Sequence, residues 1–127
     1  MNGLLLLGDG KGSFRPQRLS ESGLFIPGDA KAMVKMRGTT NEYLLAVSQN
    51  RGPLKLFRAR AAQRLVTFLP GDRFMYLQLK NGKKRKEELY IGTSFLSQSA
   101  AFTSVNSLIS KIEIVNAKGE RRVIIDY

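Results

Sequence analysis

The stretch LQLKNGKKRKEELYIG, residues 77–92, decides the fold expected for this chain. It contains the dipeptide Asn81-Gly82, which is flanked by two segments with alternating apolar residues, 73–80 and 84–91. Asn and Gly both accept the positive φ angles of a type I′ turn, so the pattern predicts a β-hairpin with a two-residue loop. The cross-strand pairs of that hairpin are expected to be Lys80 with Lys83, Leu79 with Lys84, Gln78 with Arg85 and Leu77 with Lys86.

Other short apolar runs are separated by turns rich in glycine, at intervals of about ten residues, and this spacing is typical of consecutive strands. Strands are expected at residues 4–7, 13–19, 30–36, 43–48, 54–58, 65–69, 73–80, 84–91, 111–115 and 121–127. Residues 59–64 are expected to form a connector, and residues 92–110 a long, partly ordered connection. No convincing helix is expected, and the predicted fold class is all-β with antiparallel sheets.

The composition excludes several kinds of active site. The 127 residues include no His and no Cys, so a Ser-His-Asp triad, a thiol nucleophile and thiolate metal ligands are excluded. The carboxylates Asp9, Asp29, Asp72 and Asp126 lie in turns or near the chain end, where Asp side chains usually bond local backbone amides. We therefore expect a protein that is not an enzyme and that holds neither a cofactor nor a metal.

The charge balance points toward acidic partners. Lys and Arg number 21 against 10 Asp and Glu, which gives a formal net charge of +11. Such an excess favours nucleic acid, anionic glycans or anionic lipid surfaces as partners. No apolar run approaches the roughly 18 residues that a membrane-spanning helix needs, so no membrane span is expected. If Met1 is the native start, the absence of a signal peptide predicts a cytoplasmic protein.

The basic part of the hairpin has two interpretations. It is either a solvated hairpin tip, whose charges discourage aggregation at the sheet edge, or a site for a polyanion such as nucleic acid or a sulfated glycan. The second interpretation requires that the hairpin cations join two arginines near the C-terminus on one continuous face. The candidate polyanion-binding residues are Lys80, Lys83, Lys84, Arg85, Lys86, Arg121 and Arg122.

Two parts of the chain resemble a known family. The segments GDGKGSF (8–14), SGLFIPGDAK (22–31) and VSQNRGPLKLF (47–57) resemble the last blade region of FG-GAP/VCBS repeat proteins, the integrin-α-like β-propellers of bacterial surfaces. The segment GTSFLSQS (92–99), which follows the basic hairpin, is similar to the ASPIC/UnbV-type C-terminal domain that comes after such propellers. The motif residues of that segment are Gly92, Ser94, Phe95, Leu96, Ser97, Gln98 and Ser99.

The resemblance implies a propeller-blade-like region at 1–60, followed by a small sandwich-like β domain at 61–127. It also implies a non-catalytic binding or assembly module that belongs to a longer exported protein at the bacterial cell surface and has a protein or glycan partner. The Asp-rich calcium loops of the family do not occur here, so calcium binding is not carried over. Open sheet edges in such a fold predict pairing with a second copy of the chain.

Overall fold

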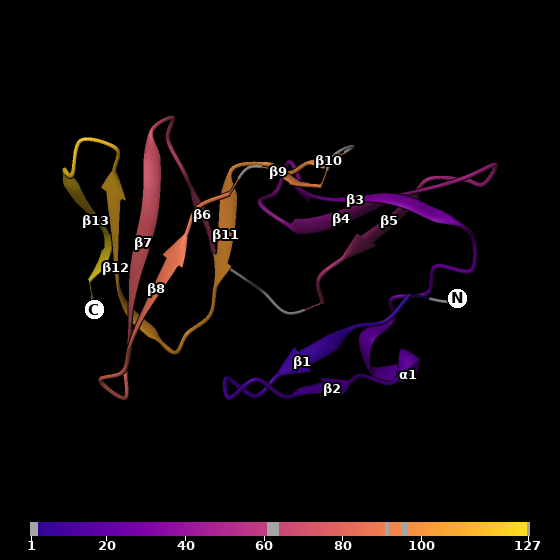
Figure 1. Ribbon diagram of the computed structural model, residues 1–127, viewed down its shortest axis with the longest axis horizontal. Helices are drawn as coiled ribbons and strands as arrows, with labels where there is room; N and C mark the ends of the chain where they lie inside the picture. Colours follow the sequence, from indigo (N-terminus) through magenta and orange to yellow (C-terminus); the bar gives the residue numbers. More distant parts are fainter. Residues whose placement is uncertain (1–2, 61–63, 91, 95–96, 127) are drawn as a thin grey trace.

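The computed structural model describes residues 3–60, 64–90, 92–94 and 97–126, and it confirms the all-β fold class (Figure 1). The described residues form one short helix and thirteen strands. In order they are β1 (Leu6–Gly8), β2 (Phe14–Pro16), α1 (Leu19–Ser22), β3 (Ala30–Arg37), β4 (Tyr43–Gln49), β5 (Lys55–Arg58), β6 (Arg64–Thr67), β7 (Asp72–Leu79), β8 (Lys84–Glu88), β9 (Gly92–Ser94), β10 (Ser97–Gln98), β11 (Phe102–Val105), β12 (Ile109–Asn116) and β13 (Arg121–Asp126).

The strands form antiparallel sheets that keep the two parts of the chain separate. Strands β1 and β2 form a hairpin, and β3, β4 and β5 form a three-stranded meander. Further along the chain, β9 pairs with β10, β6 pairs with β11, and a four-stranded sheet has the order β13-β12-β7-β8. Within the described ranges, no sheet combines a strand before residue 60 with a strand after residue 64.

The main core lies between the β6–β11 pair and the four-stranded sheet. Its buried side chains come from both layers: Val66, Phe68, Met75, Leu77, Val105, Ile109, Ile112, Ile114 and Ile125. Because side chains alternate along a strand, Met75 and Leu77 face this core while Tyr76 faces outward. The central strands β7 and β12 therefore turn apolar side chains to the core and mainly polar ones outward, as is common for antiparallel sheets.

The β6–β11 pair is the middle layer of the molecule, and Figure 1 shows it between the four-stranded sheet and β3–β5. One face of the pair contributes Val66 and Val105 to the core, and the opposite face carries Phe102 and Thr67. The Phe102 ring meets the Tyr43 ring edge-on, with centroids 5.6 Å apart. The Thr67 Oγ1 accepts a hydrogen bond of 3.0 Å from the Arg37 guanidinium. This second face thereby joins the two parts of the chain.

Lys35 strengthens the same junction. Its ammonium donates to the Phe102 carbonyl and lies 5.2 Å from the centroid of the Phe102 ring. Its backbone N–H donates to the Ser99 Oγ at 3.2 Å, and its carbonyl accepts from the Ala100 N–H at 3.0 Å. Partial burial at this junction lowers the pKa of the Lys35 ammonium, because the charged form loses water. Residues 99 and 100 thus occupy part of the free edge of β3.

Two sequence-based expectations about elements are wrong. The strand expected at 13–19 ends at Pro16, and the helix α1 follows, with the Glu21 carboxylate accepting the Arg18 N–H at 3.2 Å. The connection expected at 92–110 contains β9, β10, β11 and the start of β12. The sequence FTSV of β11 has no local strand pattern, because the strand is stabilised by pairing with β6, which is distant in the sequence.

The hairpin of β7 and β8 exists, but the expected two-residue type I′ loop is wrong. The loop has three residues, since the Leu79 N–H donates to the Lys83 carbonyl and the Gly82 N–H donates to the Leu79 carbonyl, both at 2.9 Å. Gly82 alone adopts a positive φ, of 81°, while Asn81 does not. This combination is the turn with a glycine bulge that three-residue hairpin loops favour.

The longer loop shifts the pairing by one residue from the expected register. Gln78 lies opposite Lys84, Tyr76 opposite Lys86 and Leu77 opposite Arg85. A one-residue shift moves every side chain of a strand to the other face relative to its partner. The loop therefore decides which cations of β8 share a face with Tyr76.

We predict that Gly82→Ala lowers the free energy of unfolding by about 1–2 kcal/mol, because a Cβ is unfavourable at positive φ. A Cβ at this position meets no atom within 4 Å, so the loss reflects backbone strain alone. Gly82→Asn should lose clearly less, since Asn tolerates this conformation. Urea denaturation of the three proteins measures the difference, and equal stability of Gly82→Ala and wild type would contradict the three-residue loop.

Candidate anion-binding face

The outward face of the four-stranded sheet gathers several of the cations that the sequence singled out. The pairing register places Lys84 and Lys86 of β8 beside Gln78 and Tyr76 of β7, and Arg121 of β13 beside β12 on the same face. We call this surface the basic face. Its residues with polar or aromatic side chains are Phe74, Tyr76, Gln78, Lys84, Lys86, Glu88, Lys111, Glu113 and Arg121.

The centre of the basic face is a hollow of about 240 Å³. Its lining comes from all four strands: Tyr76, Leu77, Gln78, Lys84, Lys111, Glu113 and Arg121. The Tyr76 side chain remains accessible there, with 37% of its surface exposed. The hollow therefore combines an accessible aromatic ring with cationic and hydrogen-bonding groups.

Interactions within the basic face hold its side chains in place. The Arg121 guanidinium forms an ion pair of 2.8 Å with the Glu113 carboxylate and lies 5.8 Å from the Tyr76 ring centroid. The Lys86 ammonium lies over the Phe74 ring, 4.1 Å from its centroid, which is a favourable cation–π distance. Since Lys86 covers Phe74, the open ring at the centre of the face is that of Tyr76.

The Glu88 carboxylate lies at the border of the basic face. It accepts a hydrogen bond from the Tyr90 hydroxyl, and this bond, followed by the nearby negative charge, raises the pKa of that hydroxyl. Because the Tyr90 hydroxyl is a neutral donor, the negative charge of Glu88 is not cancelled by this bond. It offsets part of the cationic charge of the basic face.

The other candidate cations lie away from the basic face, so the single continuous face that the polyanion interpretation requires does not form. Arg85 lies opposite Leu77, on the opposite face of the sheet, and pairs with the Glu87 carboxylate. Lys83 lies at the end of the loop, opposite Leu79. The physical reason is alternation: neighbouring residues of a strand point to opposite faces, so a run of four cations is divided between them.

Arg122 has a structural partner. Its guanidinium pairs at 2.6 Å with the Asp72 carboxylate, whose side chain is only 7% exposed. The same carboxylate accepts the Leu69 N–H at 2.8 Å, which confirms the expected bond between Asp72 and a local backbone amide. Arg122 thereby neutralises a nearly buried charge instead of facing a ligand.

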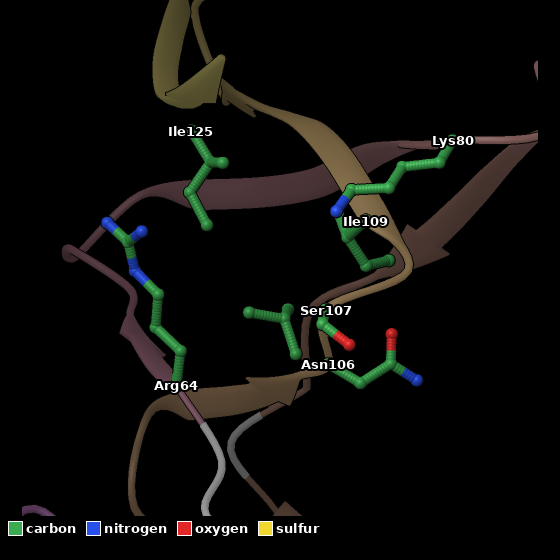
Figure 2. A pocket seen from close by; sticks show the side chains of 7 residues that line it. Arg64, Lys80, Asn106, Ser107, Ile109 and Ile125 are labelled. Atoms are coloured by element: carbon green, nitrogen blue, oxygen red, sulfur yellow. The ribbon is translucent and has the colours of Figure 1, made fainter. Parts of the chain in front are cut away.

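Lys80 lines a different cavity, of about 520 Å³, where β6 and β11 face β12 and β13. Figure 2 shows the side chains of Lys80 and Arg64 on opposite sides of this cavity. Its remaining lining residues are Val105, Asn106, Ser107, Ile109 and Ile125. The Asn106 carboxamide oxygen accepts the Leu108 N–H at 3.1 Å, so this side chain shapes the loop before β12.

Five of the family-motif residues can be placed, and Ser99 meets β3. Gly92 and Ser94 belong to β9, Ser97 and Gln98 belong to β10, and Ser99 is buried against Lys35. Phe95 and Leu96 lie outside the described residues. The part of the motif that can be placed therefore contributes to the contact between the two parts of the chain.

Two other candidate carboxylates, Asp9 and Asp29, act locally, and the Asp126 side chain lies outside what the structure describes. The Asp9 Oδ1 accepts the N–H groups of Lys11 and Ser13 at 2.7 and 3.1 Å, and these bonds lower the pKa of Asp9. Asp29 forms an ion pair of 2.7 Å with Lys31. Within the described ranges, no cluster of three or more His, Cys, Asp or Glu side chains could hold a metal ion.

Sequence reasoning missed several residues of the basic face, namely Tyr76, Gln78, Lys111 and Glu113. The alternation in 73–80 could have placed Tyr76 on the outward face. Lys111 and Glu113 join the face through the pairing of β12 with β7, across more than thirty residues of sequence, and no local pattern reveals this.

Comparisons with known proteins identify no relative. No protein-family model, curated protein or solved structure matches this chain. Among the described residues, no helix has the length and apolar character needed to cross a bilayer.

We predict that Arg122→Ala lowers the free energy of unfolding by about 1–3 kcal/mol, because the Asp72 carboxylate would lose its cationic partner where little water reaches it. Arg121→Ala, in the neighbouring position, should lose at most about 1 kcal/mol because its ion pair is exposed. Urea denaturation measures both values. A loss for Arg121→Ala as large as that for Arg122→Ala would contradict the assignment of Arg122 as the structural cation.

Proposed function

We propose that this chain is a non-catalytic binding and assembly module, and that it forms the C-terminal part of an exported bacterial FG-GAP/VCBS repeat protein with an ASPIC/UnbV-type domain. The observation that carries the proposal is an uncovered apolar sheet face on the β3–β5 meander. The resemblance of 8–14, 22–31, 47–57 and 92–99 to that family supports the same proposal, which includes a location outside the cell or on its surface.

The apolar face is defined by cross-strand pairs on one side of the meander. Val34 lies opposite Ala46, which lies opposite Leu56, and Met36 lies opposite Leu44. Met36 is 42% exposed and Leu56 is 61% exposed, so the outer strands of this face are open to solvent, while Ala46 on the central strand is buried between its neighbours. An open apolar sheet face marks a surface that another layer covers.

A meander of this kind suits stacking against a neighbouring blade. In propellers, small antiparallel sheets pack around a central axis and cover one another's faces. Strand β5 is also an edge strand, since its described neighbours include β4 alone. Such an edge can pair with a strand of a second copy. Both features favour assembly with another β-sheet.

The alternative, a polyanion-binding protein that uses the whole hairpin at 80–86, receives less support. Its cations are divided between two faces, and Arg122 is bound to Asp72. Loose attraction of polyanions by the net charge of +11 remains compatible with either function.

We predict that the chain self-associates reversibly through the apolar face, because a second copy can replace the missing neighbouring sheet. The double variant Met36→Lys with Leu56→Lys should weaken self-association at least about tenfold, or by 1.4 kcal/mol. Sedimentation velocity over a range of protein concentrations measures the effect.

Met33→Lys provides the matched control. Met33 lies on the same strand and is 41% exposed, but it lies on the opposite face from Met36. The single variant Met36→Lys should weaken self-association, while Met33→Lys should leave it unchanged. A chain that stays monomeric at all concentrations, or equal effects of the two methionine variants, would contradict assembly through the apolar face.

A further inference from the structure

The hollow of the basic face offers three kinds of group to a ligand. The Tyr76 ring gives a flat apolar surface, the Lys84 ammonium gives positive charge, and Glu113 and Gln78 give oxygen acceptors. These groups come from three adjacent strands of one sheet, whose backbone fixes their spacing. A ligand that uses all of them must have flat apolar patches, negative charges and hydroxyl donors.

From this combination we propose that the basic face binds an acidic polysaccharide, a chain of sugar rings that bears carboxylate or sulfate groups. The C–H face of a sugar ring packs against an aromatic side chain, as other flat apolar groups do. Its acidic groups form charge-assisted hydrogen bonds with lysine ammonium groups. Its hydroxyls donate to carboxylate and carboxamide oxygens, which the Glu113 and Gln78 side chains provide.

The size of the basic face suits more than one sugar ring. The face extends from β8 across β7 and β12 to β13, which is three strand spacings, or about 14 Å. Lys84 and Lys86 lie at one edge, and Arg121 lies at the other, with Tyr76 between them. A polysaccharide that crosses the strands would meet a cation on each side of the ring.

Nucleic acid fits this face less well. Single-stranded nucleic acid is held by a positively charged groove along the backbone and by successive aromatic rings on which bases stack. Here Lys86 covers Phe74, so Tyr76 is the accessible ring inside the basic face, and the exposed Tyr90 at its border is bonded to Glu88. Glu88 and Glu113 also lie among the cations, so the face offers carboxylate acceptors for hydroxyls and no unbroken row of cations for successive phosphates.

The proposal rests on the proposed function only in taking the chain to be a binding module, and its site lies on a different sheet from the apolar face.

We would titrate the full chain by calorimetry with heparin, which carries sulfates, and with hyaluronate, which carries carboxylates alone. Neutral dextran and an oligothymidylate are the comparison ligands. The salt concentration would be about 0.15 M, so that loose attraction of exposed charges is screened.

Two double variants make the test specific. Lys84→Gln with Lys86→Gln removes two charges from the basic face. Lys83→Gln with Arg85→Gln removes two neighbouring charges that lie outside it, one at the end of the loop and one on the other face of β8. We expect the first to weaken glycan binding at least about tenfold and the second by less than about twofold. Tyr76→Thr, which retains β propensity, should weaken binding by about threefold to tenfold, while Tyr76→Phe retains it.

Binding of heparin, hyaluronate or both with this pattern supports the proposal, and the preferred polymer identifies the acidic group. Equal losses for the two double variants would overturn it, since they would show attraction by net charge alone. The proposal also fails if no acidic glycan binds, if Tyr76→Thr binds normally, or if the oligothymidylate binds more tightly. Self-association of Lys84→Gln with Lys86→Gln should equal that of the wild type, so the outcome is separate from the test of assembly.

Discussion

The register between β7 and β8 is the constraint on which the rest of this structure depends. The loop of Lys80, Asn81 and Gly82 sets it, and Gly82 makes the loop possible by adopting a positive φ. With this register, Met75 and Leu77 fill the core while Tyr76 faces outward between Lys86 and Glu113. A loop shorter by one residue would turn β8 over and remove Lys84 and Lys86 from the face that holds Tyr76.

Alternation along strands also gives the molecule its layered order and its two distinct surfaces. The β6–β11 pair directs Val66 and Val105 into the core and directs Phe102 toward Tyr43, so a single pair of strands serves two contacts. Beyond these contacts, the apolar face lies on the β3–β5 meander and the basic face on the four-stranded sheet. Under the proposed function, the first surface serves assembly and the second serves recognition, so neither activity obstructs the other.

The sequence predicts most of the individual strands because their alternation and turn residues are local. The strands expected at 30–36 and 43–48 agree with β3 and β4 to within one residue at either end. Prediction fails where the decisive partner is distant, as for β11 with β6, or where two turn types share one sequence signal, as at Asn81-Gly82. The run of cations at 83–86 is visible in the sequence. Which of them share a face with Tyr76 depends on the register of β7 and β8, which the Asn-Gly pair alone does not determine.

The most direct test of this account is a measurement of cross-strand Hα–Hα nuclear Overhauser effects in the hairpin. Such contacts are strongest between residues that do not exchange backbone hydrogen bonds, because their Cα atoms are closest. The Leu79–Lys83 and Arg73–Leu89 bonds make Tyr76–Lys86 and Gln78–Lys84 pairs of this kind. Strong effects are expected for these two pairs. Strong effects between Leu77 and Lys86 and between Leu79 and Lys84 would instead show the two-residue loop, and would contradict the basic face.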